Sequence, residues 1–150
     1  MTGELRVEHV IAAPPGAVFD AFTSHAGQVA FYGTDEPGWI VESRCDLRVG
    51  GLWAVTFGPR RDHLYEHRNV FEVIDRPRRI AVATTEHRPD RPSFTFAVAF
   101  TFEQMPDGGT RMAAIQSGFP SAELRSEHGR GVPNALARLA RLARLARTLA

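Results

Sequence analysis

The segment 94–102 constrains the fold more than any other part of the chain. It reads Phe-Thr-Phe-Ala-Val-Ala-Phe-Thr-Phe, so every second position holds phenylalanine or valine. Side chains of a β-strand point alternately to its two faces, and the pattern therefore predicts a strand with one aromatic face. Such a face needs a second layer over it, which the rest of the chain has to supply.

Alternation with a period of two extends over residues 39–117 and predicts about six strands in an antiparallel meander. Glycine and proline place the expected turns at 49–51, 58–59, 75–77, 88–92 and 106–109. A further strand is predicted over 5–11, ahead of the meander. The inward rows should form one concave wall made of Trp53, Val55 and Phe57, of Ile80, Val82 and Thr84, and of Met112, Ala114 and Gln116.

Helical spacing occurs before and after the meander. Pro14 and Pro15 suit the opening of a helix with Val18, Phe19 and Phe22 on its apolar face, and a second short helix should include residues 29–32. Repeated Leu-Ala-Arg triplets predict a C-terminal amphipathic helix of about 15 residues, in which Pro133 is either the first helical residue or a kink. Its apolar face would hold Val132, Leu139, Leu142, Ala143, Ala146 and Leu149, opposite the solvated Arg138, Arg141 and Arg144.

The basic residues exclude some functions and leave one question open. All 18 are arginine, which excludes lysine Schiff-base chemistry and the lysine of a phosphate-binding loop. The net charge of +1 divides into −3 for residues 1–120 and +4 for residues 121–150. A cationic face opposite a leucine face also occurs in helices that bind membranes or nucleic acid. The uncovered aromatic strand favours the other interpretation, in which this helix covers the sheet, so no nucleic acid partner is expected.

Length and cysteine content define the expected setting. At 150 residues the chain should form one domain, 1–150, with an ordinary core. Cys45 is the only cysteine, which rules out an intrachain disulfide and points to the cytoplasm. No apolar run suits a signal peptide or a membrane span.

Polar residues with chemical potential gather in segment 63–69. His63 and His67 match the H-x-x-E-H zinc pattern, which requires a helix. The alternating flanks predict a strand, on which the two histidines lie about 13 Å apart, so no metal or other cofactor is expected. Counting by twos places Tyr65, His67 and Asn69 on the apolar side of their strand. Gln116 likewise lies at the end of the inward row of its own strand. A bulge, or exposure at an open strand end, remains the alternative.

Five segments in order along the chain resemble a known family. They are Ala-Pro-Pro-Gly-Ala-Val-Phe-Asp-Ala-Phe-Thr at 13–23, Asp-Leu-Arg-Val-Gly-Gly at 46–51, Gly-Gly-Thr-Arg at 108–111, Gln-Ser-Gly-Phe at 116–119, and His128 with Gly131. The pattern is similar to homologues of the activator of heat-shock protein 90 ATPase, within the START-like or SRPBCC superfamily. This resemblance implies an α+β helix-grip fold, in which a curved antiparallel sheet wraps around a long C-terminal helix and two short helices follow the first strand.

The resemblance also implies an apolar cavity, which relatives use for lipids, polyketides or other hydrophobic small molecules. Two positions depart from many members, because Val132 and Phe31 stand where tryptophan is common. The residues expected to bind such a ligand are Trp53, Val55, Phe57, Tyr65, His67, Asn69, Phe71, Phe96, Phe100, Met112, Gln116, His128, Leu136 and Leu139. Ligand binding is the favoured function.

Two other functions stay open. A cyclase or dehydratase would use His67 or His128 as general base and Tyr65 to polarise a carbonyl. A chaperone-binding module would use Arg138 and Arg141, although the chain resembles bacterial single-domain members, which lack the second domain of the eukaryotic co-chaperone. A homodimer is an assembly that the sequence neither requires nor excludes.

Overall fold

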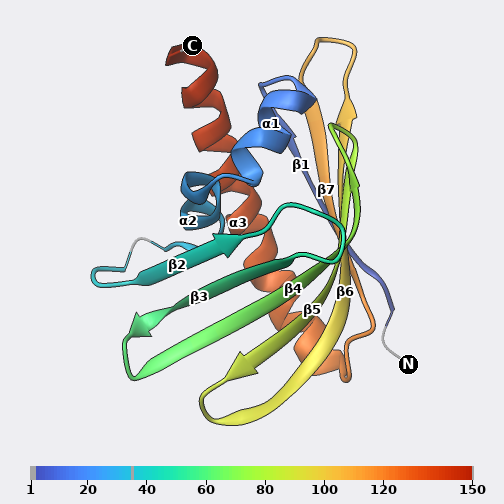
Figure 1. Ribbon diagram of the computed structural model, residues 1–150. Helices are drawn as coiled ribbons and strands as arrows, with labels where there is room; N and C mark the ends of the chain where they lie inside the picture. The colour runs from blue at the N-terminus through green and yellow to red at the C-terminus, as the bar shows by residue number, and fades with distance from the viewer. Residues whose placement is uncertain (1–2, 35, 150) are drawn as a thin grey trace.

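The described residues form seven strands and three helices, arranged as a curled sheet around one long helix (Figure 1). The computed structural model describes residues 3–34 and 36–149, with backbone alone from residue 145. The strands are β1 (Leu5–Ile11), β2 (Ile40–Cys45), β3 (Leu52–Arg60), β4 (His63–Asp75), β5 (Arg79–Arg88), β6 (Arg91–Gln104) and β7 (Thr110–Ser117). The helices are α1 (Pro15–Phe22), α2 (His25–Tyr32) and α3 (Ala122–Leu149). The predicted helix-grip fold is confirmed.

The sheet is antiparallel throughout, in the order β1-β7-β6-β5-β4-β3-β2. The predicted strand at 5–11 and the six strands of the meander are all present. In β6, which pairs with β5 and β7, Phe96, Val98, Phe100 and Phe102 are buried, as the alternation predicts. The inward rows of β3, β5 and β7 face the same interior.

Two strand details differ from the prediction. Gly58 and Pro59 do not form a turn, because β3 continues through them to Arg60 and its register with β4 shifts there. A Cβ at residue 58 would lie 2.4 Å from the His63 carbonyl oxygen, so glycine serves a close approach of two strands rather than a reversal. In β4 the register shifts between Phe71 and Val73, and Ile74 packs against the core in place of Val73.

The C-terminal helix is longer than its leucine-rich repeat predicts. It begins at Ala122 and has 28 residues, with Pro133 in its interior rather than at its start. The Ser121 hydroxyl accepts a hydrogen bond from the Leu124 amide, which caps the first turn. Packing against the sheet sustains a segment whose glycines and proline disfavour a helix in isolation.

The faces of α3 largely follow the predicted pattern. Val132, Leu139 and Ala143 are buried and Leu142 is half-buried, while the side chains of Ala146 and Leu149 lie outside the described residues. Arg141 and Arg144 are exposed. Within the described residues no helix is long and apolar enough to cross a membrane.

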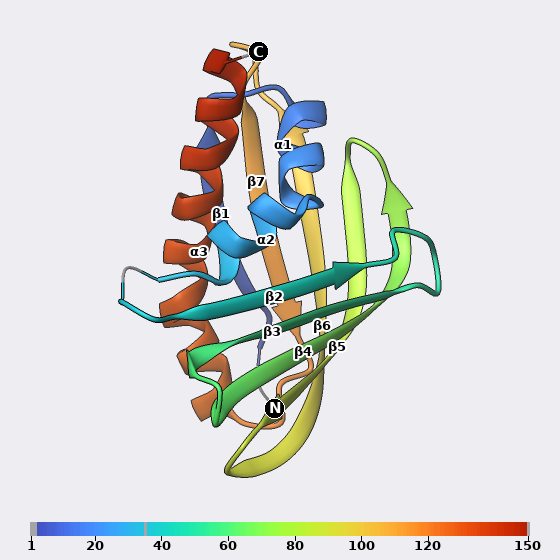
Figure 2. The same ribbon diagram turned by 60° about the vertical axis from the view of Figure 1, so that its left-hand side comes forward.

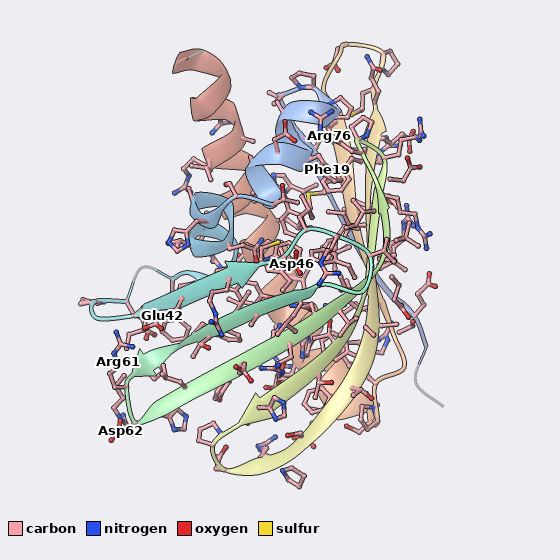
Figure 3. All side chains as sticks on the ribbon, viewed as in Figure 1. Phe19, Glu42, Asp46, Arg61, Asp62 and Arg76 are labelled. Carbon is pink, nitrogen blue, oxygen red and sulfur yellow. The ribbon has the colours of Figure 1, made fainter. Side chains whose placement is uncertain are left out.

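The helix α1 lies over one half of the concave face, the end of α2 borders both halves, and α3 runs along the face (Figures 1 and 2). The Phe22 ring of α1 packs against Trp53 at 5.2 Å, against Phe100 at 4.6 Å and against Phe31 of α2 at 5.3 Å, between ring centroids. Arg76 of the β4–β5 turn lies beside Phe19 (Figure 3) and makes two hydrogen bonds to Asp20. Aromatic packing and this pair hold α1 in place.

Candidate functional site

A cavity of about 270 Å³ lies between the concave face of the sheet, α2 and the first half of α3. Its lining consists of Phe31, Tyr32, Gly33, Thr34, Trp39, Phe57, Tyr65, His67, Asn69, Thr84, Glu86, Arg88, Val98, Phe100, Ala114, Gln116, Glu127, His128, Gly131, Val132, Ala135 and Arg138. We call the region around Asn69, Thr84, Glu86 and Gln116 the hollow half of the concave face. The region where Trp53, Phe71, Phe102 and Met112 pack with Phe22 is the filled half.

Glu86 organises the polar end of the cavity. It continues the inward row of Ile80, Val82 and Thr84 on β5 and is only 2% exposed. Its Oε1 accepts hydrogen bonds from Nε2 of His67 at 2.6 Å and from Nε2 of His128 at 3.2 Å, and its Oε2 accepts one from Nε of Arg88. A single carboxylate therefore joins β4, β5 and α3.

The charge states in this cluster follow from burial and pairing. Burial alone would raise the pKa of Glu86, but hydrogen bonds from His128 and His67 outweigh it and hold this pKa well below its usual range. Burial lowers the pKa of His67 despite the opposing pull of Glu86. Near neutral pH, Glu86 is therefore an anion beside a neutral His67 imidazole.

The neutral imidazole connects Glu86 to a tyrosine on α2. Because Nε2 of His67 donates to Glu86, Nδ1 is unprotonated and accepts a hydrogen bond from the Tyr32 hydroxyl at 2.9 Å. Burial, followed by the nearby Glu86 charge, raises the pKa of Tyr32, so the phenol keeps its proton. The result is a buried chain of hydrogen bonds from Tyr32 through His67 to Glu86.

Arg88 balances the charge of Glu86 and closes this end of the site. Its NH1 lies 2.9 Å from a carboxylate oxygen of Glu127 on α3. Its guanidinium carbon lies 5.5 Å from the ring centroid of Tyr65 and 5.4 Å from that of Phe94. The carboxylates of Glu86 and Glu127 thus hold one arginine between two rings.

A second set of polar groups adjoins this cluster along β4 and β5. Asn69 donates to the Trp53 carbonyl at 3.0 Å and accepts from the Thr84 hydroxyl at 2.6 Å. Gln116 is 7% exposed, and its Oε1 has no hydrogen-bond partner among the described residues. A buried acceptor without a partner is costly.

A family model now identifies the architecture. The model for "Activator of Hsp90 ATPase homolog 1-like protein" matches residues 12–144. The chain belongs to this family. A comparison with curated proteins finds no match.

Solved structures of similar bacterial proteins share this fold, although their sequence identity to this chain is low. A Chromobacterium violaceum protein has a TM-score of 0.77 at 21% identity, covering 95% of this chain and 98% of that one. The AHSA1 protein of Silicibacter pomeroyi has a TM-score of 0.76 at 21% identity, covering 95% and 99%. A Mycobacterium smegmatis protein has a TM-score of 0.74 at 20% identity, covering 93% and 89%.

The residues expected to bind a ligand in this family member separate into two groups. Phe57, Tyr65, His67, Asn69, Phe100, Gln116 and His128 line the cavity. Trp53, Val55, Phe71, Phe96, Met112, Leu136 and Leu139 are packed in the core instead. Phe22 and its neighbours fill the space over Trp53, so facing inward does not by itself bring a residue to the cavity.

Several residues of the site were not predicted from the sequence. Glu86 and Arg88 follow Thr84 at intervals of two, and extending that row would have found them. Glu127 lies on the part of α3 that the repeat does not predict, and the contact of Tyr32 with His67 depends on tertiary packing.

The expected solvated position of Arg138 is wrong. Its guanidinium donates to the carbonyl oxygens of Ala30 at 2.7 Å and Phe31 at 3.0 Å, at the C-terminus of α2. Carbonyl groups at a helix C-terminus lack partners within the helix and carry partial negative charge, which favours a cation there. Arg138 therefore binds α2 to α3 and is not part of an open cationic surface.

Proposed function

We propose that this protein binds a hydrophobic small molecule in the cavity between sheet and helix. The observation that carries the proposal is the hollow half itself, where an otherwise close-packed interior leaves about 270 Å³ open. Rings of Phe31, Phe57 and Phe100 supply apolar walls, and a few buried polar groups are available to orient a ligand. This combination is typical of small-molecule sites.

The dimensions and walls favour a small, flat ligand. Ligand pockets usually measure on the order of 300–1,000 Å³, so this cavity is at the lower end of the range. Aromatic rings form much of its lining, and rings of a ligand can pack against them face to edge. Compact aromatic or alicyclic molecules fit this description better than long acyl chains.

Native mass spectrometry and a thermal-shift panel of lipids, aromatic polyketides and simpler aromatics test the proposal. Panel members that bind should raise the melting temperature of the protein and add their mass to it. Ala135 lines the cavity from α3, so Ala135→Leu should reduce its volume and abolish the shift. Ala137→Leu on the same helix is the control, because Ala137 is half-buried outside the lining and should retain the shift. If no panel member binds the unmodified protein, the proposal fails.

One observation favours acid–base catalysis as a second candidate. His67 and His128 both line the cavity and share Glu86, an arrangement that orients the two imidazoles toward one carboxylate. Catalysis predicts exchange of an acidic C–H of a bound ketone with solvent deuterium, detectable by mass spectrometry and lost in His128→Gln. Exchange at the rate of the protein-free control would exclude it.

A further inference from the structure

Gln116 is an exception among the buried polar residues that the structure describes. It is 7% exposed, and its side chain makes no hydrogen bond to any described residue. An unsatisfied buried amide is costly, so it needs an explanation other than the stability of the fold. The remaining buried polar residues each have a hydrogen-bond partner within the protein, and they are Gln28, His67, Asn69, Thr84, Glu86 and Thr110.

The wall around Gln116 offers the amide no partner. The residues that β6 and β7 contribute to the cavity lining are Val98, Phe100, Ala114 and Gln116. Across the sheet Gln116 is paired with Val98 on one side and with Leu5 of β1 on the other. One amide therefore lies in a part of the cavity wall whose other side chains are apolar.

The orientation of this amide determines what it can bind. Its Oε1 is enclosed in the wall, so Nε2 is the polar atom that Gln116 can present to the cavity. The reverse orientation would bury two N–H donors without acceptors, which is rarer in proteins than an acceptor left unpaired. Gln116 therefore offers hydrogen-bond donors to a molecule in the cavity.

Two other donors without a partner among the described residues do not point to a ligand as strongly. The indole nitrogen of Trp53 is buried without a partner, but Trp53 packs in the filled half and is not part of the cavity lining. The Tyr65 hydroxyl belongs to the lining, but Tyr65 is only half-buried, so its need for a partner is weaker. Gln116 alone of these three is both buried and part of the lining.

We propose that the cavity binds an uncharged, largely apolar molecule with a carbonyl group, and that Gln116 recognises the carbonyl oxygen. This inference rests on the proposed binding function and names the chemistry of its ligand. A carbonyl oxygen accepts hydrogen bonds, so it complements Nε2, while the apolar frame of the molecule packs against Val98, Phe100 and Ala114. A carboxylate would lose its water against the same apolar wall with one amide as its partner, which favours an uncharged ligand.

Calorimetric titration with the aryl ketone tetralone and the hydrocarbon tetralin tests the proposal, because the two bicyclic molecules differ in one carbonyl group. Gln116→Met removes the amide and keeps a side chain of similar length. The affinity for tetralone should then fall about tenfold, the contribution of one net hydrogen bond, while the affinity for tetralin does not fall. Gln104→Met, at an exposed position of β6, is the matched control and should leave both affinities unchanged.

Infrared spectroscopy of bound tetralone detects the hydrogen bond directly. Donation to the oxygen weakens the C=O bond, so the carbonyl band of isotope-labelled tetralone should lie at lower frequency in the unmodified protein than in cyclohexane. In Gln116→Met the band should move back toward its position in cyclohexane. A band at the cyclohexane position in the unmodified protein would overturn the proposal.

Urea unfolding without ligand separates recognition of a ligand from a role in the fold. Gln116→Met should be at least as stable as the unmodified protein, because an amide without a partner does not stabilise the folded state. A clear loss of stability would assign Gln116 to the fold and overturn its role in recognition.

The outcomes of the titrations distinguish the two proposals. An unchanged ratio of tetralone affinity to tetralin affinity in Gln116→Met overturns recognition of a carbonyl oxygen and leaves the binding function standing. Binding of panel members that include no carbonyl compound has the same meaning. Any other carbonyl compound of the panel that binds should lose affinity in Gln116→Met by the same factor. Absence of binding by the whole panel and by both bicyclic molecules overturns both proposals.

Discussion

The filled half and the hollow half are built from the same strands, and the difference lies in what the inward rows carry. On β4, Phe71 packs in the filled half, while Asn69 and His67 on the same row border the cavity. On β5, Ile80 and Val82 are followed by Thr84 and Glu86. Strand alternation therefore decides which residues face inward, and the short helices decide where the interior is filled.

The halves also differ in what holds them together. Ring contacts at 4.6–6.2 Å around Phe22 stabilise the filled half by burial of apolar surface. Paired charges and directed hydrogen bonds around Glu86 stabilise the hollow half. One half is close-packed, and the other keeps a space open between walls whose charged groups are paired with one another.

The largest expected effect is loss of packing in the filled half. Phe22→Ala should lower the free energy of unfolding by about 3–5 kcal/mol, because Phe22 is 1% exposed and its neighbours cannot close the gap. Val98→Ala in the cavity wall should cost about 1.5 kcal/mol, close to the transfer term alone. Urea unfolding followed by circular dichroism measures both. Similar losses would mean that the two halves are equally packed.

Removal of the Glu86 carboxylate should cause the next largest decrease in the free energy of unfolding. Glu86→Ala leaves two histidines buried without their acceptor and Arg88 with Glu127 as its remaining carboxylate, and it should lower the free energy of unfolding by about 3 kcal/mol. The control is Glu127→Ala, since the Glu127 side chain is 36% exposed and Arg88 would still have Glu86. That variant should cost no more than about 1 kcal/mol. Equal costs in urea unfolding would contradict the central place of Glu86.

Much of the difference between the two halves was predictable from the alternation of inward and outward residues along the strands. The inward direction of His67, Asn69 and Gln116 follows from counting by twos, and their burial confirms it. Glu86 is available by the same rule, since it continues the row of Thr84. A charged residue on an inward row contradicts the expected core and is therefore an informative sign of a site.

The position of the cavity along the rows was not predictable in this way. Trp53 and Phe57 alternate on β3, yet only Phe57 lines the cavity because α1 places Phe22 over Trp53. Hydrogen bonds of Tyr32 and Arg138 depend on where α2 meets the sheet and α3. Such contacts join residues far apart in the chain, and local sequence patterns therefore do not predict them.

A pH dependence should distinguish the hollow half by a smaller effect. The pKa of His67 is lowered below its ordinary 6.5 in the folded protein, so the unfolded chain takes up a proton first as the pH falls. The contribution of His67 to the free energy of unfolding is present above pH 6.5. Between pH 6.5 and 5 it should decline by at most about 1.4 kcal/mol per pH unit. The lowered pKa of Glu86 acts only below its ordinary 4.5, outside this window.

Urea unfolding at pH 7, 6 and 5 measures the slope of the free energy of unfolding against pH. Two histidine variants identify the group that causes it. His67→Gln should flatten it, whereas His87→Gln, on the same sheet but away from the cavity lining, should keep it. A flat profile in the unmodified protein would contradict burial of a neutral His67. An unchanged slope in His67→Gln would assign the effect elsewhere.

The smallest effect concerns α2, the element shared by both halves, because Phe31 packs on Phe22 while the neighbouring Tyr32 bonds to His67. Arg138→Met removes two hydrogen bonds to the end of this helix and should cost about 1 kcal/mol, given partial exposure of the pair. Amide hydrogen exchange should accelerate in α2 more than in β6, since β6 keeps its partners. Arg141→Met, at an exposed position one turn away, should change stability by less than about 0.5 kcal/mol and leave exchange in α2 unaltered. Faster amide exchange in α2, with the stability of the filled half unchanged, would show that Arg138 stabilises the cavity wall. Faster exchange throughout the protein would show that the two halves unfold as one unit.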